Sequence, residues 1–359
     1  MMNRHQTPSE KVSKVAVPKK FALLLFLFLA VILEHIRFPA FEIRPLFATT
    51  ETTDKKSNEQ TIWAFNNSGS LLSADPRPNL PQGHDFVLIF LDSSYLDPFS
   101  VWLHYYKQHD NSQRILFVFA LSEECYQQLH RVLFHNQQNI LEQAGQNIVL
   151  TNLDFGKRIS QSRIWSTRIQ ILKQLVHIFP NNNIILSDAD AIWIRDPRVL
   201  YEQQASDSDI VASRATFPAK CALTARRVTM CMGFTFFRNG PLMRDFWSPM
   251  KGSDDQVAVN CRLRQQYTSI DTGNTSEGAD WESFQANGTS VFKVTILPYT
   301  QIIRHCGGLP DGLYVAHCLV DKTGRNKMIG FRTTKLLTSN VTLYSWSTNQ
   351  DLLNTSKRT

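Results

Sequence analysis

Residues 183–197 read Asn183-Ile-Ile-Leu-Ser-Asp188-Ala-Asp190-Ala-Ile-Trp193-Ile-Arg-Asp196-Pro197, an apolar run that ends in two carboxylates and then resumes. The apolar residues predict a buried strand, and Asp196-Pro197 predicts the turn that closes the segment. In a mainly parallel α/β sheet, ligands bind at the carboxyl ends of strands. Because strand side chains alternate with period two, we expect Asp188 and Asp190 on the same side of that edge. Two hard oxygen ligands so placed are typical of a Mg²⁺ or Mn²⁺ site that carries a diphosphate.

An Asp-x-Asp pair also occurs on solvated loops, where it has no function. A solvated loop rarely has an apolar run before the acids and an Ile-Trp-Ile run after them, as this segment has. The flanking residues therefore favour a metal or diphosphate site over a surface loop.

A longer pattern around these acids carries a resemblance to a known family. The segment Trp165-Ser-Thr-Arg168-Ile-Gln-Ile-Leu-Lys173 is followed by a helical run to Pro180, by the two acids and by Trp-x-x-Asp-Pro. Over about residues 85–335 this arrangement resembles the nucleotide-diphospho-sugar transferase family that includes plant xylosyl- and arabinosyltransferases. The resemblance implies a GT-A fold in which Asp188 and Asp190 bind a metal, while Asp188 and Arg168 help to bind the donor.

The segment Ser253-Asp254-Asp255-Gln256 opens a predicted helix, for which Ser253 or Asp254 is a suitable cap. A capped helix alone would explain it. The resemblance implies more, because Asp255-Gln256 is similar to an Asp-Gln motif that faces the donor sugar in retaining transferases. A carboxylate and an amide can together bind sugar hydroxyls, so Asp255 and Gln256 are the candidate catalytic residues.

The carboxyl-terminal part contains a predicted strand that ends at His317, followed by Gly324-Arg-Asn-Lys327. A lone His is usually structural. The resemblance implies that His317 completes the metal site and that Gly324 and Lys327 bind the diphosphate. The gap between His317 and Gly324 is longer than in bacterial and glycogenin-like relatives.

A predicted strand over 231–238 contains Gly233, which would permit a close backbone approach. The resemblance implies that this strand borders the sugar pocket. Many family members have a small polar residue where this chain has Met232, so a polar contact from that position is not expected.

The fold class follows from strands that alternate with helices. Apolar runs at 86–91, 114–121 and 147–150 are each followed by a segment of helical spacing, at 99–108, 123–134 and 164–179. This order predicts a mainly parallel, doubly wound α/β sheet flanked by helices. No Gly-x-Gly-x-x-Gly follows the first strand, so a dinucleotide cofactor has no support. Asp92-Ser93-Ser94 could contact a nucleotide base or simply cap a turn.

The amino-terminal part predicts a membrane anchor. Residues 1–20 form a basic cytoplasmic tail, and the apolar run from Phe21 to Leu33 lies within a signal anchor at 21–38. A cleaved signal peptide is the alternative, although no clear Ala-x-Ala site follows. Residues 39–84 read as a luminal stem, 85–345 as the transferase domain and 346–359 as a tail. The five glycosylation acceptor tripeptides downstream fit a Golgi single-pass type II protein: Asn66, Asn274, Asn287, Asn340 and Asn354.

The net charge of +7 comes largely from the basic head, and no stripe of Arg and Lys interleaved with aromatics follows, so nucleic acid is not an expected partner. The six cysteines are scattered rather than closely paired as in a zinc site, and in a lumen they are expected to form disulfides. Cys221 and Cys231 are the nearest pair in sequence, but the pairing stays open.

The interpretation is a membrane-anchored glycosyltransferase that uses Mn²⁺ or Mg²⁺ and moves a sugar from a nucleoside-diphosphate donor, expected to be a UDP-linked pentose or galactose, to a glycan or glycoprotein. The resemblance implies retention of the anomeric configuration. An Asp-x-Asp phosphatase is disfavoured, because its motif would follow the first strand. A luminal carbohydrate-binding or scaffold protein of the same fold remains the alternative.

Overall fold

The computed structural model describes residues 64–65, 71–72, 82–135, 147–156, 160–222, 228–266, 269–271, 282–285, 293–304, 308–317 and 323–346. Within this described part, no helix combines the length and apolar composition that a membrane crossing requires. The predicted anchor at 21–38 and most of the predicted stem lie outside it. Of the acceptor asparagines, Asn340 lies inside it, at an exposed turn. Two short strands of the predicted stem, β1 (Ala64–Phe65) and β2 (Leu71–Leu72), pair antiparallel.

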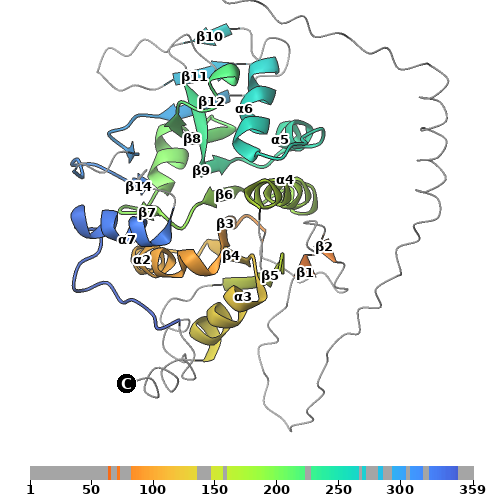
Figure 1. The fold of residues 1–359 in the computed structure, drawn as a ribbon. Coiled ribbons are helices and arrows are strands. Elements are labelled where there is room, and N and C mark those ends of the chain that lie inside the picture. The colour runs from red at the N-terminus through yellow and green to blue at the C-terminus, as the bar shows by residue number, and fades with distance from the viewer. Residues whose placement is uncertain are drawn as a thin grey trace, which may run out of the picture. The chain divides into compact units, whose positions relative to one another are not determined.

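A nine-stranded sheet in the order β10-β11-β12-β8-β9-β6-β3-β4-β5 forms the centre of the fold (Figure 1). Its strands are β3 (Asp85–Leu91), β4 (Arg114–Ala120), β5 (Asn147–Asn152), β6 (Ile184–Ser187), β8 (Ile210–Ala215), β9 (Thr229–Phe237), β10 (Ser269–Asp271), β11 (Glu282–Gln285) and β12 (Lys293–Leu297). Seven of the nine strands run in one direction, and β9 and β11 run in the other. The prediction of a mainly parallel α/β sheet is confirmed.

The first half of the sheet is built from the predicted strand and helix pairs. The connecting helices are α2 (Leu96–Tyr106), α3 (Glu123–His130) and α4 (Gln161–Ile178). Serines cap two of them, since Ser122 accepts from the backbone N–H of Cys125 and Ser160 from that of Arg163. The helix predicted to continue to residue 134 changes at Arg131 into a π-helical turn, Arg131–His135.

Strand β9 interrupts the parallel order that the sequence predicts. Parallel neighbours need a crossover of a dozen or more residues, usually a helix, whereas antiparallel strands need no crossover. Between β8 and β9 the structure describes a single 3₁₀ turn, η5 (Ala219–Cys221), and no helix among the residues it covers there. The chain therefore returns directly, and β9 pairs antiparallel with both β8 and β6.

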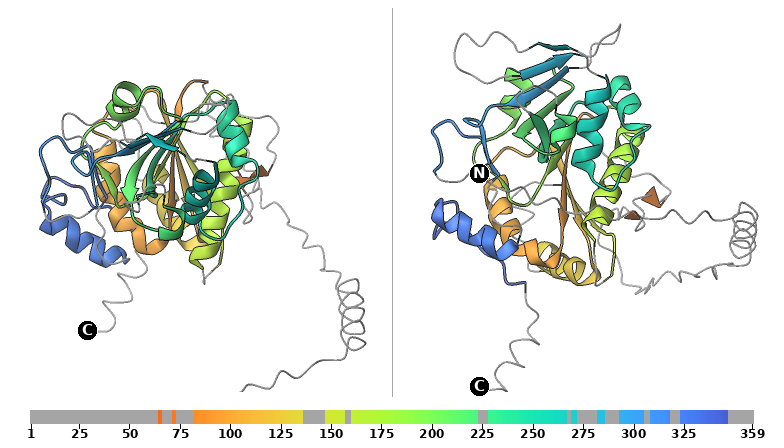
Figure 2. Two further views of the ribbon diagram at one scale, coloured as in Figure 1. Left: turned by 90° about the horizontal axis from the view of Figure 1, so that it is seen from above. Right: turned by 45° about the horizontal axis from the view of Figure 1, so that its top comes forward.

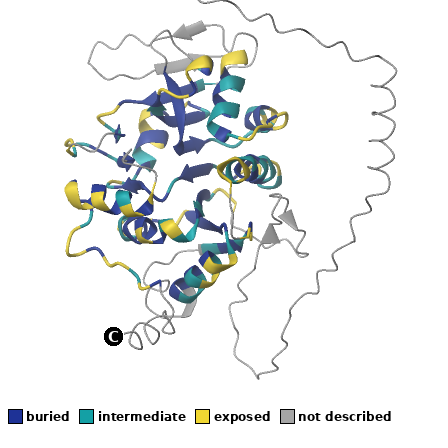
Figure 3. Ribbon diagram, viewed as in Figure 1, coloured by how far each residue is buried: buried dark blue, intermediate teal, exposed yellow. Residues whose placement is uncertain are grey.

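Helices cover both faces of the sheet (Figures 1 and 2). On one face lie α2, α3 and α7 (Gly324–Thr333), and on the other lie α4, α5 (Pro241–Trp247) and α6 (Asp255–Gln266). Strand β3 supplies both cores by alternation, because Val87, Ile89 and Leu91 pack in one cluster while Phe86 and Leu88 pack in the other. The strands are accordingly buried, and the outer sides of the helices are exposed (Figure 3).

A second, three-stranded sheet brings the carboxyl-terminal part to the two acids. It contains β7 (Ala191–Trp193), β14 (Val315–His317) and β13 (Ile302–Ile303). Strand β14 pairs antiparallel with β7 in a register that sets His317 opposite Ala191. This pairing places His317 next to the acidic motif although about 125 residues separate them.

The Trp-x-x-Asp-Pro part of the motif is structural. Trp193 is buried among Trp102, Tyr106 and Phe234. Asp196 forms an ion pair with the buried Arg114, and it also accepts from the backbone N–H of Arg198. These contacts hold β7 against α2 and β4, and thus keep the preceding turn in place.

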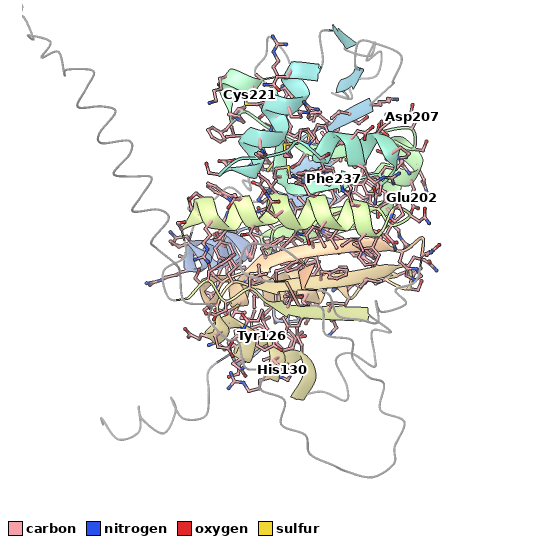
Figure 4. The ribbon with its side chains drawn as sticks, turned by 90° about the vertical axis from the view of Figure 1, so that its right-hand side faces the viewer. Tyr126, His130, Glu202, Asp207, Cys221 and Phe237 are labelled. Carbon is pink, nitrogen blue, oxygen red and sulfur yellow. A yellow bond between two sulfur atoms is a disulfide. The ribbon has the colours of Figure 1, made fainter. Side chains whose placement is uncertain are left out.

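One disulfide joins Cys221 of η5 to Cys261 of α6, and Figure 4 labels Cys221 beside that helix. The nearest pair in sequence, Cys221 and Cys231, is therefore not bonded. Cys231 lies on β9 with its sulfur 3.7 Å from the Nδ1 atom of His317. Within the described residues Cys125 and Cys231 are free and buried.

Candidate active site

A pocket of about 590 Å³ opens at the edge of the sheet where the parallel strands end. It is lined by residues that follow β3, β4 and β6, by the end of β8 and by the middle of β9. The strand order β8-β9-β6-β3-β4 therefore lays out its walls, with about 4.8 Å between neighbouring strands. Pockets of about 300 to 1,000 Å³ are typical of small-molecule sites, so the volume suits a nucleotide sugar.

Asp188 and Asp190 lie in the middle of this pocket, in a turn and not in a strand. Strand β6 ends at Ser187, and Ala191 donates its backbone N–H to the Asp188 carbonyl oxygen over 2.9 Å. The backbone N–H of Asp188 donates to the Gly233 carbonyl over 2.7 Å. The prediction that the two carboxylates lie together is confirmed, but the period-two argument for it was wrong.

His317 meets both acids. Its Nε2 atom lies 3.8 Å from Asp188 Oδ2 and 3.6 Å from Asp190 Oδ1. One ligand atom from each of these three residues lies within 4.8 Å of the others, a spacing that can hold a metal ion. The Asp188 side chain is 37% exposed to the pocket, whereas Asp190 and His317 are buried.

Lys327 and Gly324 come from the first turn of α7, which Thr323 caps. The Lys327 Nζ atom lies 2.5 Å from Asp190 Oδ2. Gly324 packs against the turn after β3, because a Cβ atom there would lie 1.7 Å from the Ser94 carbonyl oxygen. The structure brings Lys327 to the acids, while the predicted diphosphate contact stays a prediction, and it gives Gly324 a packing role.

Arg168 and Asp255 form a buried pair on the wall opposite α7. The Arg168 Nε atom lies 2.8 Å from Asp255 Oδ2, and its Nη1 atom lies 3.3 Å from Asp188 Oδ1. Its Nη2 group also donates to the Met232 carbonyl. Burial raises the pKa of Asp255 to about 6 although Arg168 opposes the rise. Asp255 is therefore held by Arg168, and Arg168 links it to the metal-ligand candidates.

Gln256 binds two backbone segments of the pocket wall. Its Oε1 atom accepts from the Met232 N–H over 3.3 Å, and its Nε2 atom donates to the Phe217 carbonyl over 2.6 Å. The cap predicted for its helix is also present, because Asp254 accepts from the Val257 N–H over 2.9 Å. Gln256 lines the pocket and holds Phe217 in place.

The turn after β3 confirms one of the two roles open for Asp92. Its carboxylate accepts from the backbone N–H and the hydroxyl of Ser94. Both residues also line the pocket. The cap is established, and a base contact remains compatible with the geometry.

The charges at the centre depend strongly on one another. Burial raises the pKa of Asp190, but His317 and Lys327 outweigh that effect and hold the pKa below its usual range. Burial lowers the pKa of His317, whereas Asp190 and Cys231 raise it to about 10. Without a metal, these effects favour the protonated imidazole, which together with Lys327 balances the two carboxylates.

Gly233 provides the close approach that the sequence predicts. A Cβ atom at this position would lie 2.1 Å from His317 Cε1 and 2.7 Å from Asp188 Oδ2. The absence of a side chain lets β9 run directly behind both residues. Gly233 is thus part of the site through its backbone.

Two residues of the pocket lie outside any recognisable sequence motif and were not predicted. Phe217 follows β8 and is 57% exposed, and Arg304 follows β13 and is 9% exposed. Each belongs to a loop that the fold brings to the pocket, and their neighbours in sequence have no diagnostic spacing.

Comparisons with known proteins identify the family of the chain. The sequence model of the nucleotide-diphospho-sugar transferase family matches residues 111–321, which is more than half of the chain. A search of curated proteins found no match.

Several solved structures are similar in part. The bifunctional WbbM glycosyltransferase is 13% identical with a TM-score of 0.37, over 72% of this chain and 46% of that one. GlyE of Streptococcus pneumoniae is 13% identical with a TM-score of 0.29, over 51% of this chain and 38% of that one. The galactosyltransferase LgtC, in complex with donor and acceptor sugar analogues, is 14% identical with a TM-score of 0.32, over 45% of this chain and 59% of that one. The chain thus spans about half the length of these proteins.

Proposed function

The chain belongs to the nucleotide-diphospho-sugar transferase family, and we propose that it is a metal-dependent glycosyltransferase that moves a sugar from a nucleoside-diphosphate donor to a glycan or glycoprotein acceptor. The observation that carries the metal dependence is the convergence of Asp188 and Asp190, in the turn between β6 and β7, with His317 of β14.

These three residues fit Mn²⁺ or Mg²⁺. Two carboxylates supply hard oxygen ligands and the imidazole supplies a nitrogen, which Mn²⁺ accepts more readily than Mg²⁺ does. Gly233 leaves room behind Asp188 and His317, and the exposed side of Asp188 faces the pocket. A bound ion would supply positive charge against a diphosphate leaving group.

The surrounding residues then have separate tasks. Lys327, which pairs with Asp190, can offer its ammonium to a diphosphate in the same pocket. Arg168 holds Asp188 and Asp255 at the wall, and Gln256 holds Phe217 and Met232. We expect the nucleoside at the ends of β3 and β4, beside Asp92 and Trp165, and the sugar towards β8.

The finer expectations of the sequence belong to the same proposal. A UDP-linked pentose or galactose is the expected donor, and the Asp-Gln pair supports retention of configuration. The basic head, the apolar run and the downstream acceptor asparagines support a Golgi type II protein with a luminal catalytic domain.

A panel of UDP-sugars tests the enzyme against the alternative, a carbohydrate-binding protein without turnover. With Mn²⁺, the full-length chain should release UDP from at least one sugar nucleotide, and Asp190→Asn should abolish this release. The matched control is Asp311→Asn, an exposed acid in the turn before β14. Binding of UDP with Mn²⁺ but no release from any donor would favour the binding protein. Release by Asp190→Asn at the rate of the parent would refute the metal site.

A further inference from the structure

Arg304 is a buried cation for which the structure describes no acidic partner. Its side chain lines the pocket, and the residue is 9% exposed. Its Nε atom has no hydrogen-bond partner, and its Nη1 group donates to the Arg214 carbonyl over 3.5 Å, a long contact. Among the described residues every other buried arginine, Arg114 and Arg168, is paired with a carboxylate.

Arg304 does not pair with the metal-ligand candidates, although its charge reaches Cys231, whose sulfur lies 3.7 Å from His317 Nδ1. In the described part of the chain it forms no ion pair with Asp188 or Asp190, whereas Lys327 and Arg168 do. It lies after β13, and its Nη1 contact is with Arg214 of β8. Strand β8 is two places from β6 in the sheet, or about 10 Å. Arg304 thus stands on the side of the pocket opposite β3 and β4.

An exposed aromatic ring lies on the same side. Phe217 follows β8, and its backbone carbonyl accepts from the Thr229 hydroxyl over 2.8 Å and from the Gln256 amide over 2.6 Å. Its segment is therefore held while 57% of the residue remains open to solvent. Large aromatic rings with an open face offer an apolar surface for the C–H side of a sugar ring.

The chemistry of Arg304 selects the kind of ligand. A buried guanidinium without a partner is unfavourable, and sugar hydroxyls do not neutralise its charge. A carboxylate does, and its two oxygens match the guanidinium fork. A phosphate would match as well, but Lys327 and the metal-ligand candidates already serve the diphosphate at the centre of the pocket.

We propose that the β8 side of the pocket binds an acidic sugar, with Arg304 paired to its carboxylate and Phe217 beneath its ring. This inference rests on the proposed function, because it names the class of sugar that the same site accepts. The acidic sugar can belong to the acceptor, or to a uronate donor in place of the neutral pentose or galactose expected above, and the same chemistry recognises either.

Matched pairs of acidic and neutral probes distinguish an acidic donor from an acidic acceptor. The donor probes are UDP-glucuronate against UDP-glucose and UDP-galacturonate against UDP-galactose, each with Mn²⁺. The acceptor probes are trigalacturonate against its methyl ester, each with Mn²⁺ and saturating UDP. Binding to the full-length chain is measured by calorimetry. We expect the parent to bind the acidic member of at least one pair at least tenfold more tightly than the neutral member.

Variants of Arg304 assign that preference to the guanidinium. Arg304→Gln should weaken binding of the acidic probe by about 10- to 100-fold, the range for a lost hydrogen-bonded charge pair. It should leave the affinity for the neutral probe within about twofold of that of the parent. Arg304→Lys keeps the charge without the fork and should give an intermediate loss. Arg332→Gln, on an exposed position of α7, is the matched control and should change neither.

Each other outcome has a definite meaning. If the parent binds UDP with Mn²⁺ but prefers no acidic probe, the inference is wrong and the proposed function stands. If Arg304→Gln weakens UDP and every sugar nucleotide equally, Arg304 binds the diphosphate and the inference is again wrong. If the parent binds no UDP with Mn²⁺, the proposed function fails and the inference with it. If Arg304→Gln does not fold, the inference is tested by two other measurements: the preference of the parent for the acidic probe, and the loss of affinity for that probe in Arg304→Lys. It is wrong if either is absent.

Discussion

Replacement of Gly233 by alanine should disable the metal site through a single methyl group. The added Cβ atom would lie 2.1 Å from His317 Cε1, whereas ordinary contact begins at 3.4 Å, so the imidazole must move by about 1.3 Å (3.4 − 2.1). His317 cannot turn aside freely, because it is buried between Asp190 and Cys231. Disturbing a residue that orients a metal ligand weakens metal binding by about 10- to 100-fold, which corresponds to about 1.4 to 2.7 kcal/mol of Mn²⁺ binding free energy.

Calorimetric titration with Mn²⁺ measures this loss, and urea unfolding without metal measures the accompanying strain, expected at about 1 to 3 kcal/mol. Gly240→Ala is the matched control, since it follows the same strand, has an extended backbone and has no atom within 4 Å of its added Cβ. It should leave Mn²⁺ affinity unchanged. If Gly233→Ala binds Mn²⁺ within about twofold of the parent, the assignment of Asp188 and His317 as ligands is refuted.

Three further predictions concern charge and covalent links. Because the pKa of His317 is raised from 6.5 to about 10, its contribution to the stability of the metal-free chain is present below pH 6.5 and should be lost as the pH rises towards 10. Mn²⁺ must displace that proton at pH 7.5, so calorimetry in two buffers of different ionisation enthalpy should detect proton release; its absence would argue against His317 as a ligand. Asp196→Asn removes the charge that neutralises buried Arg114 and should lower the free energy of unfolding by about 3 kcal/mol in urea, while Mn²⁺ affinity of the folded protein stays near that of the parent. Loss of the Cys221–Cys261 bond, which spans 40 residues, should cost about 4 kcal/mol in the Cys261→Ala variant; an unchanged urea midpoint under oxidising conditions would contradict the bond.

The sequence was sufficient for the features that depend on local pattern. The alternation of apolar strands with helical segments predicts β3 to β6 and α2 to α4 within a few residues. The two acids after an apolar run predict the centre of the site, because burial on both sides of a charged pair is rarely without a function. The helix cap at Asp254 follows from residue type alone.

Features that depend on contacts between distant segments could not be derived in this way. The side chains of Asp188 and Asp190 lie close together because both residues belong to the turn after β6, and strand periodicity does not predict that turn. The reversal of β9 depends on a connection whose described residues contain no crossover helix, and the bond between Cys221 and Cys261 depends on where η5 meets α6. Arg304 has no local signal, because only the folded arrangement reveals that no described residue offers it an acidic partner.

If Asp190 binds a metal ion as proposed, its ion pair with Lys327 makes the binding of that metal and the binding of a diphosphate energetically dependent on each other. Both Lys327 and a metal ion are attracted to the same carboxylate, so each weakens the hold of the other on it. A diphosphate that draws the ammonium away from Asp190 removes this competition and improves metal binding. Thermodynamic reciprocity then requires that the metal improve diphosphate binding by the same factor. Occupancy of the site by the metal ion would therefore rise more steeply when the metal and the nucleoside diphosphate increase together than when either increases alone. In a compartment that lacks the nucleotide, the chain would bind free metal weakly.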